Sequence, residues 1–145
     1  MKLVGPKRGR KPEKLRRVGR VESWGGYVHV RADRDRSGPE RHSLHTLTLK
    51  GNLNEPVSGV SAFEMSVYSD PRAGISAGDT PAVGSWVKVK PVLDGLVMLT
   101  EREFDMVLAL AAEGKLLSVA VSFQKPHYGR GVITSVDFSS EMLDE

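Results

Sequence analysis

The alternation of hydrophobic and polar positions between residues 83 and 90 predicts a half-buried strand. Val87 and Val89 share one side of such a strand, because successive side chains point to opposite faces. The other side, expected to face outward, carries Trp86, Lys88 and Lys90. After a short interruption the apolar residues resume at positions 96–99, so this part of the chain predicts sheet structure leading into the next element.

A helix is expected over about residues 100–113. Thr100 and Glu103 have the spacing at which each side chain can bond the other residue's backbone N–H at a helix start. Gly114 can adopt the left-handed conformation that often ends a helix. Between them, an apolar stripe at helical spacing predicts the buried face: Phe104, Val107, Leu108 and Ala111.

Three alternating segments precede this region and predict strands over about residues 21–31, 44–53 and 60–68. In the first, Val28 and Val30 are expected to point inward, and the Gly25–Gly26 pair to mark a bend or bulge. Residues 32–41 are rich in charge and are expected to form a loop.

The end of the chain predicts a hairpin, with strands over residues 116–125 and 131–139 and a turn at 126–129. Together these elements predict one α+β domain that is mainly antiparallel β, with about six strands and one helix. The sheet can close as a small barrel of the oligonucleotide-binding type, or stay open and curved with the helix on one face.

The charge is divided unevenly along the 145 residues. Residues 1–20 carry nine Lys or Arg against one acidic residue, whereas the remainder carries twelve basic and seventeen acidic residues. Few apolar residues occur in the first segment, so we expect 1–20 to be a flexible basic tail on a single domain at 21–145. A basic tail on a mildly acidic body indicates contact with a polyanion through the tail.

Within this tail, the run from Pro6 to Pro12 contains an Arg8-Gly9-Arg10 core flanked by Lys7 and Lys11. The run resembles the AT-hook, a short motif whose arginines enter the narrow minor groove of A·T-rich DNA. Lys11 departs from the motif, since it separates the core from the proline that usually follows directly. A generic basic tail that contacts phosphates at any sequence is the alternative.

The sequence contains no cysteine and no apolar run long enough to span a membrane. His42 and His45 are three apart at the start of a predicted strand, so they lie on opposite faces and do not predict a metal pair. No nucleophile, carboxylate pair or phosphate loop stands in a suitable context. We therefore expect a soluble, cytoplasmic protein that is not an enzyme and needs no cofactor.

Two parts of the body have a composition suited to nucleic acid. The outward row of a tryptophan and two lysines can stack on bases and neutralise phosphates, and the hairpin turn near His127 gathers further cations and an aromatic ring. With the tail, the candidate residues are Lys7, Arg8, Arg10, Lys11, Arg16, Arg17, Trp86, Lys88, Lys90, Lys125, Tyr128 and Arg130.

These features predict a nucleic-acid-binding accessory protein. The alternative is a protein-binding module, such as a small inhibitor or assembly factor, whose acidic body docks on a basic partner. The sequence leaves the choice between DNA and RNA, and the oligomeric state, open.

Overall fold

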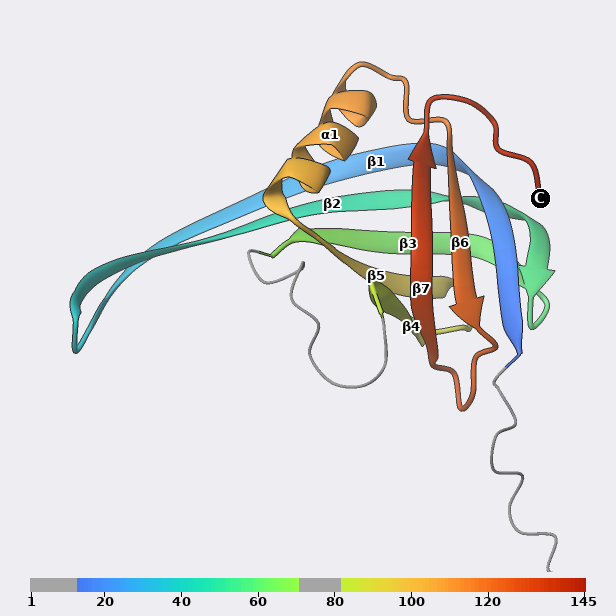
Figure 1. Cartoon of the computed structure of the whole chain (residues 1–145), viewed down its shortest axis with the longest axis horizontal. Coiled ribbons are helices and arrows are strands. Elements are labelled where there is room, and N and C mark those ends of the chain that lie inside the picture. The colour runs from blue at the N-terminus through green and yellow to red at the C-terminus, as the bar shows by residue number, and fades with distance from the viewer. Residues whose placement is uncertain (1–12, 71–81) are drawn as a thin grey trace, which may run out of the picture.

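The strands of this protein follow its alternating segments, and several extend further than the sequence pattern predicts. The computed structural model describes residues 13–70 and 82–145 (Figure 1). In chain order the elements are β1 (Lys14–Asp35), β2 (Gly38–Val57), β3 (Val60–Ser69), β4 (Gly84–Lys88), β5 (Leu93–Leu99), α1 (Glu101–Ala112), β6 (Ser118–Gln124) and β7 (Gly131–Ser139).

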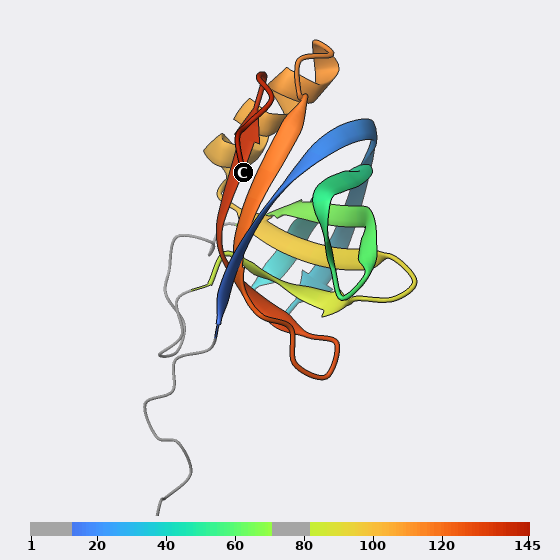
Figure 2. The same ribbon diagram turned by 90° about the vertical axis from the view of Figure 1, so that its right-hand side faces the viewer.

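Seven strands form one closed ring in the described residues, in the order β1-β2-β3-β5-β4-β7-β6 and back to β1. All neighbours are antiparallel except β3 and β5, which run parallel. α1 covers one end of the ring, and the β6–β7 turn lies at the opposite end (Figure 2). The expectation of a mainly antiparallel α+β fold with one helix is confirmed for this part of the chain.

The inner faces of the strands supply one hydrophobic core. Buried side chains alternate with less buried ones along β2 and β3, as the sequence predicts. In β6, the odd-numbered residues are the ones that belong to the core. Their shared interior is filled by Leu47, Leu49, Leu53, Phe63, Met65, Val67, Val119, Val121 and Phe123. This core fixes which side of each strand is left for binding.

The helix begins as predicted. Thr100 Oγ1 accepts a hydrogen bond from the Glu103 N–H at 3.3 Å, and Glu103 Oε1 accepts one from the Thr100 N–H at 2.8 Å. Gly114 has a φ of 70° just beyond the helix end. One part of the predicted stripe is wrong, because Leu108 is exposed, whereas Leu110 packs against the core.

Replacing Thr100 with alanine is expected to lower the free energy of unfolding by about 1 kcal/mol. The Glu103 N–H loses its hydrogen-bond acceptor, and the reciprocal bond from the Thr100 N–H to the Glu103 side chain loses its support. Denaturant unfolding followed by circular dichroism measures this change. Thr134, whose hydroxyl donates to the Ser122 carbonyl at 3.2 Å, provides a control outside any helix. An unchanged midpoint for Thr100→Ala would contradict the capping role.

The first two strands are longer than predicted, and they project from the ring as an arm (Figure 1). Residues 28–45 pair only across the β1–β2 hairpin in the described structure, and we call this segment the arm. The predicted charged loop at 32–41 is therefore wrong, since a two-residue turn joins Asp35 to Gly38. Val28 and Val30 do not reach the core either, because they lie beyond the ring and are 66% and 47% exposed.

The start of β1 corrects the predicted boundary of the tail. Lys14–Arg20 pair with Ser118–Gln124 of β6, so these residues belong to the ring. Local composition alone gives this segment too few apolar residues to bury, but β6 pairs with its backbone, the Val18 N–H donates to the Glu145 carboxylate, and Val18 is fully buried. Residues 1–12, with the AT-hook-like run, lie outside the described residues.

Candidate nucleic-acid interface

Two of the predicted binding regions meet at the end of the ring opposite α1. β4 pairs with β7, and this pairing places Trp86 opposite Gly131, next to the β6–β7 turn. A groove of about 840 Å³ opens there, in the size range of ligand sites. Its lining includes Val87, Lys125, Pro126, His127, Arg130 and Val132. We call this groove, with the neighbouring Lys88, the basic end.

The backbone of the β6–β7 turn, which carries Arg130, has a fixed conformation. The His127 N–H donates to the Arg130 carbonyl at 2.6 Å, and the Arg130 N–H donates to the His127 carbonyl at 3.1 Å. Tyr128 and Gly129 both have positive φ, as a two-residue type I′ hairpin turn requires. The Tyr128 ring is exposed and packs edge-on against the His127 ring, with centroids 4.2 Å apart.

The expectation that Trp86 faces outward is wrong. Trp86 is 0% exposed and packs edge-to-face against Phe123, whereas its neighbour Val87 is 45% exposed. The cause is a register irregularity between Trp86 and Lys88 in the β4–β5 pairing, which shifts the alternation by one position. Trp86 therefore supports the wall of the groove from the core and is not available to stack on a base.

Lys88 and Lys90 are exposed, in agreement with the outward side that the sequence predicts for them. Lys88 follows the groove residue Val87 along β4. Lys88 ends β4, whereas Lys90 lies between β4 and β5 and is not among the residues that line the groove. Lys88 adds positive charge to the basic end, and neither lysine takes part in the core.

The basic segment 1–12 joins the described structure at this same place. Glu13 lines the groove, its carbonyl accepts the Lys125 N–H at 2.7 Å, and its carboxylate lies 3.6 Å from Lys125 Nζ. Lys7, Arg8, Arg10 and Lys11 lie outside the described residues, but the chain connects them directly to Glu13. The sequence predicts the tail and the hairpin turn as separate binding elements. In the fold, the chain joins the tail to the same end of the ring as the turn.

Arg16 and Arg17 belong to β1, so their assignment to a flexible tail is wrong. Arg16 Nη1 donates to the Asp144 carbonyl at 2.5 Å, and Arg17 Nε donates to the Pro56 carbonyl at 3.4 Å. These bonds hold the two guanidinium groups against other parts of the body. Arg16 and Arg17 are therefore not part of a flexible basic tail.

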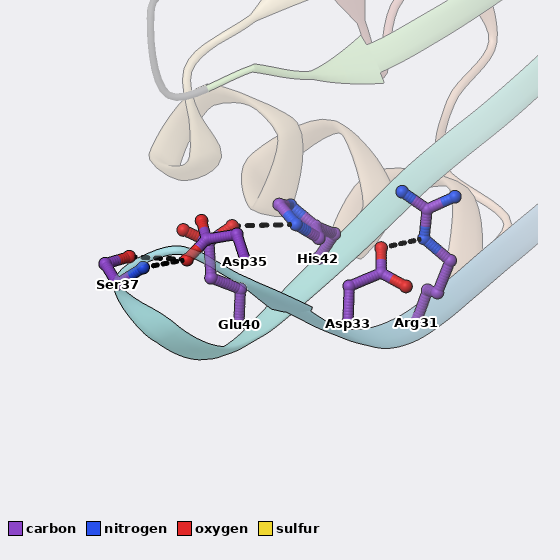
Figure 3. Close-up of polar contacts among 6 residues, drawn as sticks. All are labelled: Arg31, Asp33, Asp35, Ser37, Glu40 and His42. Carbon is purple, nitrogen blue, oxygen red and sulfur yellow. Dashed lines mark hydrogen bonds and ion pairs between the residues drawn. The ribbon is translucent and has the colours of Figure 1, made fainter.

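The charged side chains at the tip of the arm pair with one another (Figure 3). Arg31 Nε lies 2.7 Å from the Asp33 carboxylate, and the corresponding distance between His42 and Glu40 is 3.1 Å. Asp35 accepts hydrogen bonds from the N–H and hydroxyl of Ser37. A side-chain hydrogen bond with Glu40, together with the bonds from Ser37, lowers the pKa of Asp35.

These local pairs leave Arg34, Arg36 and Arg41 exposed and without an ion pair among the described residues, so the tip keeps four arginines against three carboxylates. Among the residues that the structure describes, no group of three or more His, Cys, Asp or Glu side chains is placed to hold a metal ion. In the same residues, no helix has the length and apolar character that a membrane crossing requires.

Comparison with protein-family models, curated proteins and solved structures finds no match. The residues and their arrangement are therefore the only basis for a functional proposal.

One surface that the sequence prediction missed lies where the arm leaves the ring. Tyr27 is 59% exposed there and borders a hollow of about 420 Å³ over β1, β2 and β3. The sequence signal for this surface was the Gly25–Gly26 pair, which the sequence prediction assigned to a bend or bulge. The register irregularity in β1 actually falls between Val21 and Ser23, and both glycines pair normally with β2.

Proposed function

We propose that this protein is a nucleic-acid-binding accessory protein that contacts the phosphate backbone at its basic end. The observation that carries the proposal is the position of the basic segment: its five cations in residues 1–12 join the ring beside a groove that already presents Lys125, His127 and Arg130. A phosphate backbone held by the segment is thereby brought against the groove.

The charge of the rest of the body supports one-sided binding. Residues 21–145 carry twelve basic and seventeen acidic residues, so most of the surface repels a polyanion. Affinity that depends on phosphate then has to come from local concentrations of cations. The basic end combines the five cations of residues 1–12 with Arg130 and with Lys125, which pairs with Glu13, whereas the arm tip sets four arginines against three carboxylates.

The strand order supports nucleic acid as the class of ligand, independently of the position of the basic end. The first five strands follow the order β1-β2-β3-β5-β4 with β3 and β5 parallel, and we relate this order to the oligonucleotide-binding barrel, with β6 and β7 added between β4 and β1. Barrels of that type bind nucleic acid on the face of their second and third strands and on the loop before the second. Here that loop is extended into the arm.

The proposal is tested by replacing Lys125 and Arg130 with glutamine in the full-length protein. Binding to duplex and single-stranded probes is followed by fluorescence anisotropy at several salt concentrations. We expect weaker binding and a log–log salt slope on duplex DNA that is shallower by about 2, because two phosphate contacts are lost.

A matched control replaces Arg102 and Lys115 with glutamine. Both are exposed and lie on or just after α1, at the opposite end of the ring, and their removal changes the net charge equally. The control is expected to bind almost as the parent does. Equal losses in the two double variants would mean that only net charge matters, which contradicts a site at the basic end.

A protein-binding module remains the second candidate, and the apolar side of the arm favours it. Val28 and Val30 lie on one face of the arm and are largely exposed, and Leu44 is exposed on the other face. The titrations above separate the two functions. If the full-length protein binds neither probe at low salt, the nucleic-acid proposal fails and the protein-binding module takes its place.

A further inference from the structure

Two glycines at the base of the arm have no packing reason to be glycines. A Cβ atom added at Gly25 or Gly26 meets nothing within 4 Å, and neither residue has positive φ. Glycine weakens a strand, because it gains no packing and loses more backbone entropy than other residues. A side chain at either position would therefore be tolerated and would favour the strand.

The other strand glycines with described surroundings differ from this pair. Gly38, the first residue of β2, has a positive φ of 120°, and at each of the rest an added Cβ would collide with a neighbouring group, as at Gly95, where it would lie 2.8 Å from the Trp86 ring. The remaining members of this crowded group are Gly19, Gly51, Gly84 and Gly131. An unexplained glycine inside a strand often marks a place where a ligand approaches the backbone.

The missing side chain of Gly25 creates the hollow at the base of the arm. Gly25 pairs with Thr48, and both lie on the outer face, between the Ser23–Lys50 and Tyr27–Thr46 pairs. The floor is thus the backbone at Gly25 with Thr48, and the borders are Tyr27 on one side and Lys50 on the other. Glu64, opposite Lys50 on β3, completes the lining.

The lining suits a flat polar ring better than a phosphate. An exposed tyrosine offers a face for stacking, and a glycine floor lets a ring approach the strand closely. Lys50 is balanced by Glu64, so the hollow has no excess positive charge to attract an isolated anion. Together Lys50, Glu64 and Thr48 offer donors and acceptors of the kind that read the edge of an unpaired base.

We propose that this hollow binds one unpaired nucleobase, which stacks on Tyr27 and presents its polar edge to Lys50 and Glu64. The inference rests on the proposed function, since it assigns a base contact to a protein whose phosphate contacts lie at the basic end. It also specifies the substrate class, because a base inside a duplex cannot enter the hollow.

The test compares Gly25→Val with the parent on two probes: a single-stranded oligonucleotide and a strand of the same length made of abasic sites. Valine fills the hollow from its floor, and we expect affinity for the normal strand to fall about tenfold, as for the loss of one stacked base. Affinity for the abasic strand is expected to stay unchanged, because its phosphates still reach the basic end.

Gly26→Val is the matched control. Gly26 pairs with Leu47, so its added side chain points to the opposite face of the same strand. This variant is expected to bind both probes like the parent. Thermal melting verifies the fold, and neither valine variant is expected to melt below the parent, because valine favours strands.

Tyr27→Ala provides a second variant that acts on the same base contact without filling the hollow, and it is expected to weaken binding only to the normal strand.

The outcomes separate the two proposals. If the parent binds normal and abasic strands equally, or if Gly25→Val and Tyr27→Ala bind like the parent, the base site is wrong and the basic end stands. If Gly25→Val weakens both probes equally, the hollow is likewise not a base site. If the parent binds neither probe, the proposed function fails, and the base site fails with it.

Discussion

Replacing Trp86 with alanine is expected to lower the free energy of unfolding by about 3 to 5 kcal/mol, since it leaves a large cavity in the core. Trp86 is fully buried, packs edge-to-face on Phe123 and lies over Gly95, where only a glycine leaves room for the indole. Chemical denaturation followed by circular dichroism measures the change without relying on tryptophan fluorescence.

The neighbouring Val87 provides the control. It is 45% exposed, and Val87→Ala is expected to change stability by about 0.5 kcal/mol or less. The sequence pattern predicts the opposite order, with Val87 inside and Trp86 outside. A larger loss for Val87→Ala than for Trp86→Ala would therefore restore the sequence-based alternation and contradict the shifted register of β4.

A shortened chain that begins at Glu13 is expected to lose most of the affinity for nucleic acid. Five cations are removed, so the log–log salt slope on duplex DNA should become shallower by about 4 to 5. The deletion has to stop at Glu13, because Lys14–Arg20 pair with β6 and complete the ring. Anisotropy titrations at several salt concentrations, with melting of the shortened chain as a fold control, provide the measurement.

A charge-preserving variant distinguishes the two ways in which the segment can bind. Arg8→Lys with Arg10→Lys keeps every positive charge, but lysine does not replace arginine well in a narrow minor groove. An AT-hook-like contact predicts that the preference for A·T-rich duplex disappears in this variant. A generic basic segment predicts no change on any probe.

Unchanged binding after deletion of residues 1–12 would place the site elsewhere on the body.

The parts of the fold that sequence predicts well are those in which local pattern and tertiary environment agree. β3 alternates buried and half-buried residues over positions 62–68, and Thr100 with Glu103 determines the helix start through contacts only three residues apart. The β6–β7 turn likewise lies where the sequence predicts it, because its position depends on a local hairpin.

The errors arise where distant segments decide the outcome. Val28 and Val30 have the pattern of a buried strand, but no third strand of the described structure lies beside them. Trp86 is buried because one irregular position shifts the alternation of β4. Lys14–Arg20 form a strand because β6 is there to pair with them. No local property of these residues contains that information.

The closure of the ring by β1 and β6 also sets an order of events during synthesis. Lys14 pairs with Gln124, so the first strand must wait for almost the whole chain before its second neighbour exists. The β1–β2–β3 meander, with the arm and the hollow at its base, can form earlier because its contacts are closer in sequence. The groove of the basic end includes residues from β4, β6 and β7, so it assembles only after residue 132 has left the ribosome. A nascent chain therefore completes the proposed surface for bases before the proposed surface for phosphates.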